Sequence, residues 1–241
     1  MTAPNARHSS RGRWLAVVLY AVAMAWVESA VVLYLRTLSN RLDPHQTEPL
    51  PLVAGLARAE VIREAATLIM LAAVGWLAGR EWRTRFGYFL VAFGVWDIFY
   101  YVFLKPLTGW PNSVLDWDVL FLIPLPWWGP VLAPVLIAAL MVLFGTLVTQ
   151  FIVGAETPWP RWPSGVAFGV GVALALYVFM ADALAVLDQG AAAVVQVLPR
   201  TFQWPLFLIA WALMAMPVFE LASRAAARTA RSARQLESQP S

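Results

Sequence analysis

Six long apolar runs are the feature of this sequence that most constrains its fold. A run of about 20 apolar residues, as a helix rising about 1.5 Å per residue, crosses the roughly 30 Å hydrocarbon core of a bilayer. Because 61% of the 241 residues are hydrophobic and 13% are charged, a water-soluble fold has too few polar side chains to cover its surface. The sequence therefore predicts an all-α, polytopic membrane helical bundle of about six transmembrane helices, over residues 14–36, 57–79, 86–105, 129–153, 164–187 and 203–221.

One apolar segment, residues 117–130, is too short to cross the membrane. Its sequence, WDVLFLIPLPWWGP, is interrupted by Pro124, Pro126 and Pro130. Proline lacks the amide hydrogen that a helix or a central strand needs. Irregular backbone at membrane depth is tolerated only where protein shelters it from lipid. We therefore expect a proline-broken re-entrant or interfacial turn here.

Lys and Arg are distributed unequally between the two ends of the predicted helices. With the N-terminus inside, the cytoplasmic flanks collect eleven, namely Arg7, Arg11, Arg13, Arg80, Arg83, Arg85, Arg161, Arg224, Arg228, Arg231 and Arg234. The opposite flanks collect five, namely Arg36, Arg41, Arg58, Lys105 and Arg200. Excess basic residues mark cytoplasmic loops. We expect a bacterial cytoplasmic (inner) membrane protein with a cytoplasmic N-terminal tail (1–13), a transmembrane domain (14–221) and a basic cytoplasmic C-terminal tail (222–241).

The residue types present limit the cofactors and partners. Cysteine is absent, which excludes iron–sulfur clusters and thiolate zinc, and the two histidines, His8 and His45, lie outside the predicted spans, which argues against haem. A site made of carboxylates alone would suit protons or hard cations. The basic residues flank the spans instead of forming a patch, so the expected partners are membrane lipids and, for an accessory subunit, other membrane subunits, but not nucleic acid.

Ionisable side chains inside the predicted spans call for an explanation, because each costs about 2.5–3.5 kcal/mol on insertion scales. They are Glu28, Glu60, Arg63, Glu64, Asp97 and Asp182. Converted to depth, the acidic ones fall in the outer half of the bilayer. Five carboxylates against one guanidinium leave an excess of negative charge. Some of these carboxylates must therefore be protonated, be wetted by a cavity or hold a bound cation.

Helical spacing brings several of these groups onto common faces. Glu60, Arg63 and Glu64 form a stripe on the second helix. The third helix carries a face of Asp97, Tyr100, Tyr101 and Lys105, and the loop on the same side adds Asp116 and Asp118, with Trp127 and Trp128 in the proline-broken turn above. The predicted ligand-binding set is Glu28, Glu60, Arg63, Glu64, Asp97, Tyr100, Tyr101, Lys105, Asp116, Asp118, Trp127 and Trp128. Within it, Glu28, Glu60, Glu64 and Asp97 are the candidate metal ligands.

A purely structural reading of the same charges stays open. In it, Arg63 holds Glu60 or Glu64, and Lys105 is held by Asp97 or a loop carboxylate, only to lock the bundle.

Four stretches of the chain resemble a family of bacterial multi-pass membrane proteins to which no activity is assigned. They are ESAVVLYLR (28–36), VIREAATLIMLAAVGWLAG (61–79), FGVWDIFYYVFLK (93–105) and LDWDVLFLIPLPWWGPVLAPV (115–135). The resemblance covers about half of the chain and implies neither an activity nor catalytic residues.

Three classes of function remain open. The first is binding or passage of a small cationic species or proton at an acidic cavity in the outer half of the bilayer. The second is an accessory subunit that packs into a larger membrane complex through small-residue faces such as Gly165, Gly169 and Ala173. The third is an enzyme that acts on a lipid-linked substrate in the outer leaflet, with a carboxylate as general acid or base.

Overall fold

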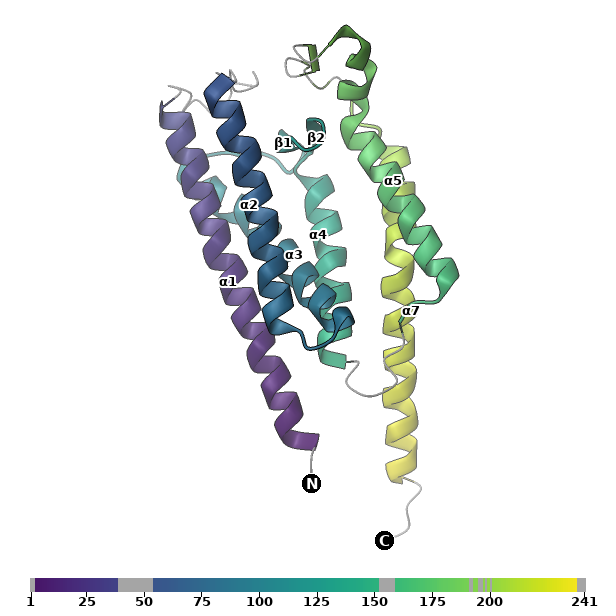
Figure 1. The fold of residues 1–241 in the computed structure, drawn as a ribbon. Helices are drawn as coiled ribbons and strands as arrows, with labels where there is room; N and C mark the ends of the chain where they lie inside the picture. The colour runs from purple at the N-terminus through teal and green to yellow at the C-terminus, as the bar shows by residue number, and fades with distance from the viewer. Residues whose placement is uncertain are drawn as a thin grey trace.

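Six helices long and apolar enough to cross a membrane make up most of the described chain (Figure 1). The computed structural model describes residues 3–38, 54–151, 159–190, 193, 194, 197, 199 and 201–237. The helices are α1 (Ala3–Leu38), α2 (Ala54–Ala78), α3 (Trp82–Thr108), α4 (Leu132–Thr146), α5 (Trp162–Ala185) and α7 (Trp204–Glu237). They confirm the predicted all-α bundle of six spans. Arg41, His45 and residues 238–241 of the predicted C-terminal tail lie outside the described residues.

Local sequence sets where the helices end. α2 and α3 are joined by a short connection that ends at Glu81, the N-cap of α3, which forms a capping box with Thr84. At the other end of α3, Gly109 adopts the left-handed conformation, with a φ of 76°, and its N–H donates to the carbonyl of Lys105. Pro163 occupies the first turn of α5, where its missing N–H costs no hydrogen bond. Each of these residues fixes the length of a span.

Helix α3 lies at the centre of the first group of helices. It packs on α1 and α2 around Ala21, Leu71 and Val91, all of which are fully buried. On its other side it crosses α4 at close range, because glycines remove the side chains between them. A Cβ atom on Gly94 would lie 2.5 Å from the carbonyl oxygen of Ala138. The α3–α4 crossing is therefore possible only with a very small residue at this position.

A second apolar core joins α4, α5 and α7. Phe179 of α5 and Phe207 and Met214 of α7 are buried in it. Here the close approach is made by Gly171, since a Cβ there would lie 2.7 Å from the carbonyl oxygen of Ala210. The predicted small-residue face of α5 is not the one that packs, because nothing lies within 4 Å of a Cβ on Gly165 or Gly169 among the described residues.

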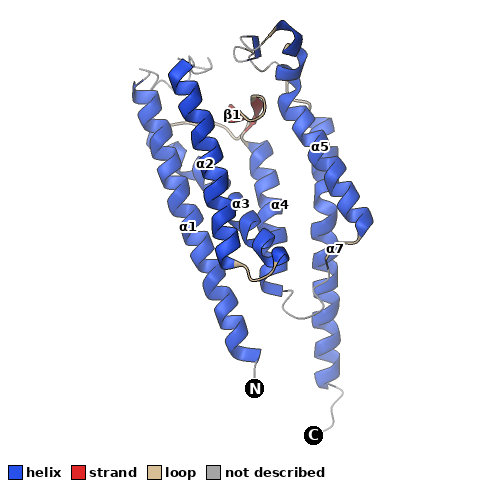
Figure 2. Ribbon diagram, viewed as in Figure 1, coloured by secondary structure: helices blue, strands red, loops and turns tan. Residues whose placement is uncertain are grey.

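Residues 117–130, the predicted proline-broken turn, form a short antiparallel hairpin (Figure 2). Strand β1 (Trp117–Phe121) pairs with β2 (Trp127–Pro130), with Trp117 opposite Pro130. Pro124 and Pro126 lie in the connection and Pro130 at the end of β2, positions where a missing N–H breaks few ladder bonds. The predicted proline-broken turn thus takes the form of a hairpin, which leads almost directly into α4.

The two ends of the bundle differ. The N-terminal end of α1 and the C-terminal end of α7 lie at one end, and the hairpin lies toward the other (Figure 1). Near the first end, α4 continues into a π-helical turn, η1 (Leu147–Phe151). At the hairpin end, α5 is followed by a short 3₁₀ turn, η2 (Leu187–Gln189).

Candidate functional site: an acidic cavity beneath the hairpin

A small cavity of about 60 Å³ lies between α1, α2, α3 and β1. We call it the acidic cavity. Its walls are Glu28 of α1, Arg63, Glu64 and Thr67 of α2, Trp96, Asp97, Tyr100 and Tyr101 of α3, and Asp118, Val119, Leu120 and Phe121 of β1. Seven residues of the predicted ligand-binding set meet here, from four segments that are separated in sequence.

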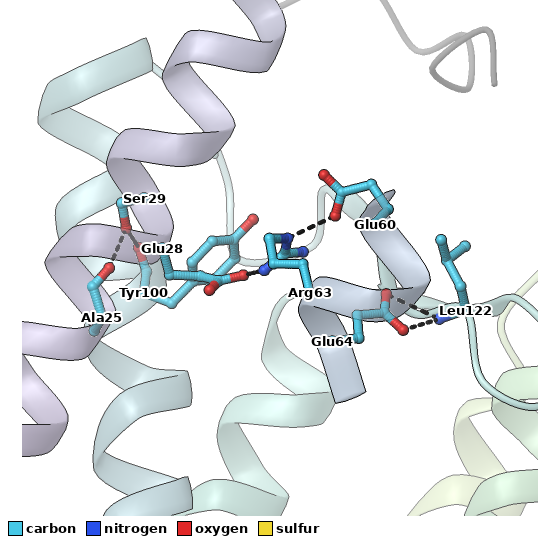
Figure 3. Close-up of polar contacts among 8 residues, drawn as sticks. All are labelled: Ala25, Glu28, Ser29, Glu60, Arg63, Glu64, Tyr100 and Leu122. Carbon is cyan, nitrogen blue, oxygen red and sulfur yellow. Dashed lines mark hydrogen bonds and ion pairs between the residues drawn. The ribbon is translucent and has the colours of Figure 1, made fainter. Parts of the chain in front are cut away.

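Arg63 is engaged by two carboxylates from two helices (Figure 3). Its Nη1 contacts Oε1 of Glu28 on α1, and its Nε donates to Oε2 of Glu60 at 2.7 Å, one turn earlier on α2. Glu28 is buried, with 8% of its surface exposed. The pair of Arg63 with Glu60 is the one that the structural reading predicted. Glu28, which that reading did not name, is the second partner of Arg63 and ties α1 to α2. Glu60 takes part in this pairing but does not line the cavity.

Glu64 connects α2 to the hairpin. Its two carboxylate oxygens accept the backbone N–H of Leu122, at 3.1 and 2.9 Å (Figure 3). Leu122 follows β1, where the chain leaves the two-stranded ladder, so its N–H needs an acceptor from elsewhere. In a low-dielectric setting an unmade backbone hydrogen bond is costly. Glu64 thus fixes the position of β1 over the cavity.

A hydrogen bond between Tyr101 of α3 and Asp118 of β1 joins the third helix to the hairpin. The Tyr101 hydroxyl donates to Oδ2 of Asp118 at 3.0 Å, and the backbone N–H of Val119 donates to Oδ1 at 2.9 Å. Asp118 lies on β1, outside the membrane-spanning helices. Burial raises its pKa to about 6, although the Tyr101 hydroxyl, the Arg36 guanidinium and the Val119 N–H act to lower it.

Two buried polar atoms of the cavity wall, on Asp97 and Trp96, have no hydrogen-bond partner among the described residues. Oδ2 of Asp97 is inaccessible to solvent and has no hydrogen-bond partner among the described residues. Trp96 is 7% exposed, and its indole Nε1 is likewise without a partner in the described part of the chain. Buried polar groups are rarely left unpaired, and an exception points to an ion, a water or a ligand. Both side chains line the acidic cavity.

Ser29 ties α1 to α3 beside the cavity. Its hydroxyl lies 2.9 Å from the carbonyl oxygen of Ala25, one turn earlier, and 3.0 Å from that of Tyr100 on α3 (Figure 3). The side chain is fully buried. This contact holds Glu28, its neighbour in sequence, against the wall formed by α3.

Four residues of the predicted set lie away from the cavity. Lys105 donates to the carbonyl of Gly109 at 2.8 Å, and Asp116 accepts the backbone N–H groups of Asn112 and Ser113, so both hold the loop after α3. Trp127 stacks on Phe179 of α5, and Trp128 is buried without lining the cavity. The two tryptophans lie away from the cavity because they are on β2. In the hairpin, β1 lines the cavity and β2 packs against α5. Asp182, on α5, is also absent from the cavity wall.

Two residues near the cavity were missed from the sequence. In the sequence, Trp96 is one of many tryptophans typical of a membrane protein. The signal that could have identified it as a cavity residue is its position next to Asp97 on a buried helix. Arg36 looked like a flanking topology residue. Its guanidinium lies over the Trp110 ring, 5.0 Å from the centroid, donates to Thr108 and acts electrostatically on Asp118. Five carboxylates in and beside the cavity thus face two guanidinium groups.

The candidate metal ligands do not converge on one point. Among the described residues, no group of three or more Asp, Glu or His side chains is placed to hold a metal ion. The carboxylates of Glu28, Glu60 and Glu64 are directed to Arg63 and to Leu122. What the arrangement offers is a small hollow with one buried carboxylate oxygen, Oδ2 of Asp97, that has no hydrogen-bond partner among the described residues. Comparisons of the chain with protein-family models, curated proteins and solved structures found no match.

Proposed function

We propose that this protein binds a proton or a small monovalent cation in the acidic cavity, as a step in holding it or passing it across the membrane. One observation carries the proposal: Oδ2 of Asp97 is buried and unpartnered at a cavity whose only lining guanidinium, within the described residues, is already shared by Glu28 and Glu60. An uncompensated buried carboxylate is unfavourable until it gains a proton or a cation.

The size of the cavity supports a small ligand. A buried water needs a cavity of about 10–15 Å³, so about 60 Å³ accommodates a few waters or one small ion. The headgroup of a lipid-linked substrate is far larger. The cavity therefore supports ion or proton binding better than lipid chemistry.

We also propose that the protein lies in a bacterial inner membrane with both termini in the cytoplasm. Eleven basic flanking residues against five support this orientation, and the start of α1 and the end of α7 lie at the same end of the bundle (Figure 1). In this orientation the acidic cavity and the hairpin lie toward the outer face.

The test is thermal stability of the purified protein in detergent with sodium, potassium, ammonium or choline chloride at equal ionic strength, each over a pH series. Choline is too large for the cavity and controls for ionic strength. A ligand at 100 times its Kd stabilises the folded state by about 2.7 kcal/mol. We expect a saturable rise in Tm with protons or with one of the small cations.

Two variants make the test specific. Asp97→Asn removes the charge with almost no change in shape and is expected to abolish the response. Asp188→Asn makes the same chemical change at an exposed carboxylate on η2 and is expected to keep it. If wild type and Asp97→Asn respond equally, the proposal is wrong.

A second candidate is an accessory subunit of a larger membrane complex. It is favoured by the face of α5 around Gly165 and Gly169, which no other described residue covers and which allows close approach of another helix. Purification in a mild detergent distinguishes the two candidates. A stoichiometric membrane partner supports the accessory role, whereas a lone chain counts against it.

A further inference from the structure

Two neighbouring residues on α3 bring opposite hydrogen-bonding needs to the acidic cavity. The indole N–H of Trp96 can only donate, and the ionised carboxylate of Asp97 can only accept. Neither Trp96 Nε1 nor Asp97 Oδ2 has a partner among the described residues, and both atoms are buried. Both side chains line the same cavity of about 60 Å³. A ligand that fits here has to accept one hydrogen bond and donate another.

A bare metal cation meets only half of this requirement. It would neutralise Asp97, but it cannot accept a hydrogen bond from Trp96, whose N–H dipole presents its positive end. Ammonium fails in the same way, because it has no free lone pair. Water meets both needs, since it has two donors and two acceptors.

We infer that the acidic cavity holds an ordered water between Trp96 and Asp97 and that the ligand is a proton exchanged through it. This inference rests on the proposed function and narrows it. A hydronium ion transfers one proton to the Asp97 carboxylate, which leaves a neutral carboxyl group and a water. In the ionised state the water accepts from Trp96 and donates to Asp97. After protonation it accepts from both, so each group keeps a hydrogen bond throughout.

Among the carboxylates that line the cavity, Asp97 is the one with a buried oxygen that has no hydrogen-bond partner within the described part of the chain. On α1 and α2, Glu28 and Arg63 pair with each other, and Glu64 accepts the Leu122 N–H. On β1, Asp118 accepts from Tyr101 and Val119. The remaining titratable and charged groups that face this region are Glu60, which pairs with Arg63, Tyr100 on α3, and Arg36, which acts on Asp118 and Tyr100.

Infrared difference spectroscopy of the purified protein over a pH series tests this inference. The C=O stretch of a protonated carboxyl group, assigned by its loss in Asp97→Asn, reports the proton, and a sharp O–H stretch reports the ordered water. In Trp96→Phe, which keeps an aromatic ring but lacks the N–H, we expect the water band to be lost and the C=O band to shift. In Trp26→Phe, a half-exposed tryptophan of α1 that does not line the cavity, we expect both bands to be unchanged.

The ion dependence separates the inference from the proposed function. At fixed pH, replacing choline chloride by sodium or potassium chloride is expected to leave the C=O band unchanged. Loss of the band in sodium or potassium would overturn the inference and leave a cation site in place. Identical spectra for wild type and Trp96→Phe would also overturn it, while proton binding to Asp97 would stand. If no Asp97 band appears and no ion changes the Tm, both the inference and the proposed function are wrong.

A measurement on the wild-type protein covers the case in which Trp96→Phe does not fold. With isotope-labelled tryptophan, the indole N–H resonance of Trp96 is expected to move with pH in wild type and to stay fixed in Asp97→Asn. A resonance that ignores pH in both proteins would contradict the inference.

Discussion

Arg63 pairs with carboxylates from two helices. It holds Glu28 on α1 and Glu60 on α2, and both carboxylates are largely buried. In Arg63→Gln two buried carboxylates lose their partner, which is expected to cost about 3 kcal/mol or more. The measurement is the apparent free energy of unfolding in detergent, or the Tm where unfolding is irreversible.

Two comparisons test whether this cost comes from the unpaired charge. The double variant Glu28→Gln/Arg63→Gln is expected to recover part of the loss. Arg224→Gln breaks a pair with Glu220 on a single helix, and Glu220 keeps the backbone N–H of Arg161, so the loss is expected to be much smaller. Equal losses for Arg63→Gln and Arg224→Gln would contradict the role assigned to Arg63.

Asp118, which lies outside the spans, makes the stability of the protein depend on pH. Its pKa rises from 3.8 to about 6 on burial, so the folded chain binds this proton more tightly than the unfolded chain. Its contribution to stability is complete below about pH 4 and is lost as the pH rises through about 6. Relative to wild type, Asp118→Asn is therefore expected to be more stable at neutral pH than at acidic pH. Tm profiles against pH check this, and parallel profiles would refute it.

At the residue scale, composition and spacing predicted several of the charges that meet at the cavity but not how each is satisfied. The stripes on α2 and α3 follow from 3.6 residues per turn, which is why Arg63, Glu64, Asp97 and Tyr101 could be expected at one site. The partner of Glu64 could not be expected, because it is a backbone N–H that becomes available only once the hairpin forms.

Among the elements, the hairpin depends on α2 for its position. Glu64→Ala removes the acceptor of the Leu122 N–H and is expected to cost about 1–3 kcal/mol locally. Hydrogen exchange over residues 117–130 measures this cost, and we expect roughly tenfold faster exchange or more. Glu64→Gln retains a carbonyl acceptor and should lose less. Glu60→Ala, one turn away on the same helix, should leave hairpin exchange unchanged, and acceleration there would contradict the assignment.

The α3–α4 crossing gives a second prediction at this scale. Gly94→Ala places a methyl group against the Ala138 carbonyl and is expected to destabilise the fold by about 1–3 kcal/mol. Gly169→Ala, a matched change on the open face of α5, should stabilise it by about 0.5–1 kcal/mol, since alanine favours helix more than glycine does. Unfolding measurements on the pair check this, and the opposite order would show that the crossing is looser than described.

The elements differ in how much the sequence could predict. Helix α3 was predicted over 86–105 and begins slightly earlier, at Trp82, because the Glu81 capping box lies outside the apolar run that marked it. For residues 117–130 the prolines predicted a re-entrant or interfacial turn but not its internal structure. The segment pairs as two strands, with its prolines in the connection and at the edge. The sequence did not predict this pairing, because it depends on a register that short apolar segments do not reveal.

For the molecule as a whole, the two helix groups meet along α3 and α4. The helices that line the acidic cavity all belong to the first group, and β1 of the hairpin completes its wall. Hydropathy was enough to predict six spans, because each needs only length and apolarity. The helix neighbours could not be predicted in the same way. Gly171, and not Gly165 or Gly169, makes the close contact with α7, and a lipid-facing glycine looks the same in the sequence as a buried one.

The most direct test is an experimental structure of the protein in a lipid bilayer at a resolution that reveals ordered water, determined at acidic and at alkaline pH. We predict density inside the acidic cavity within hydrogen-bonding distance of both Trp96 Nε1 and Asp97 Oδ2. An empty cavity in which Asp97 has turned to a protein donor would contradict this account.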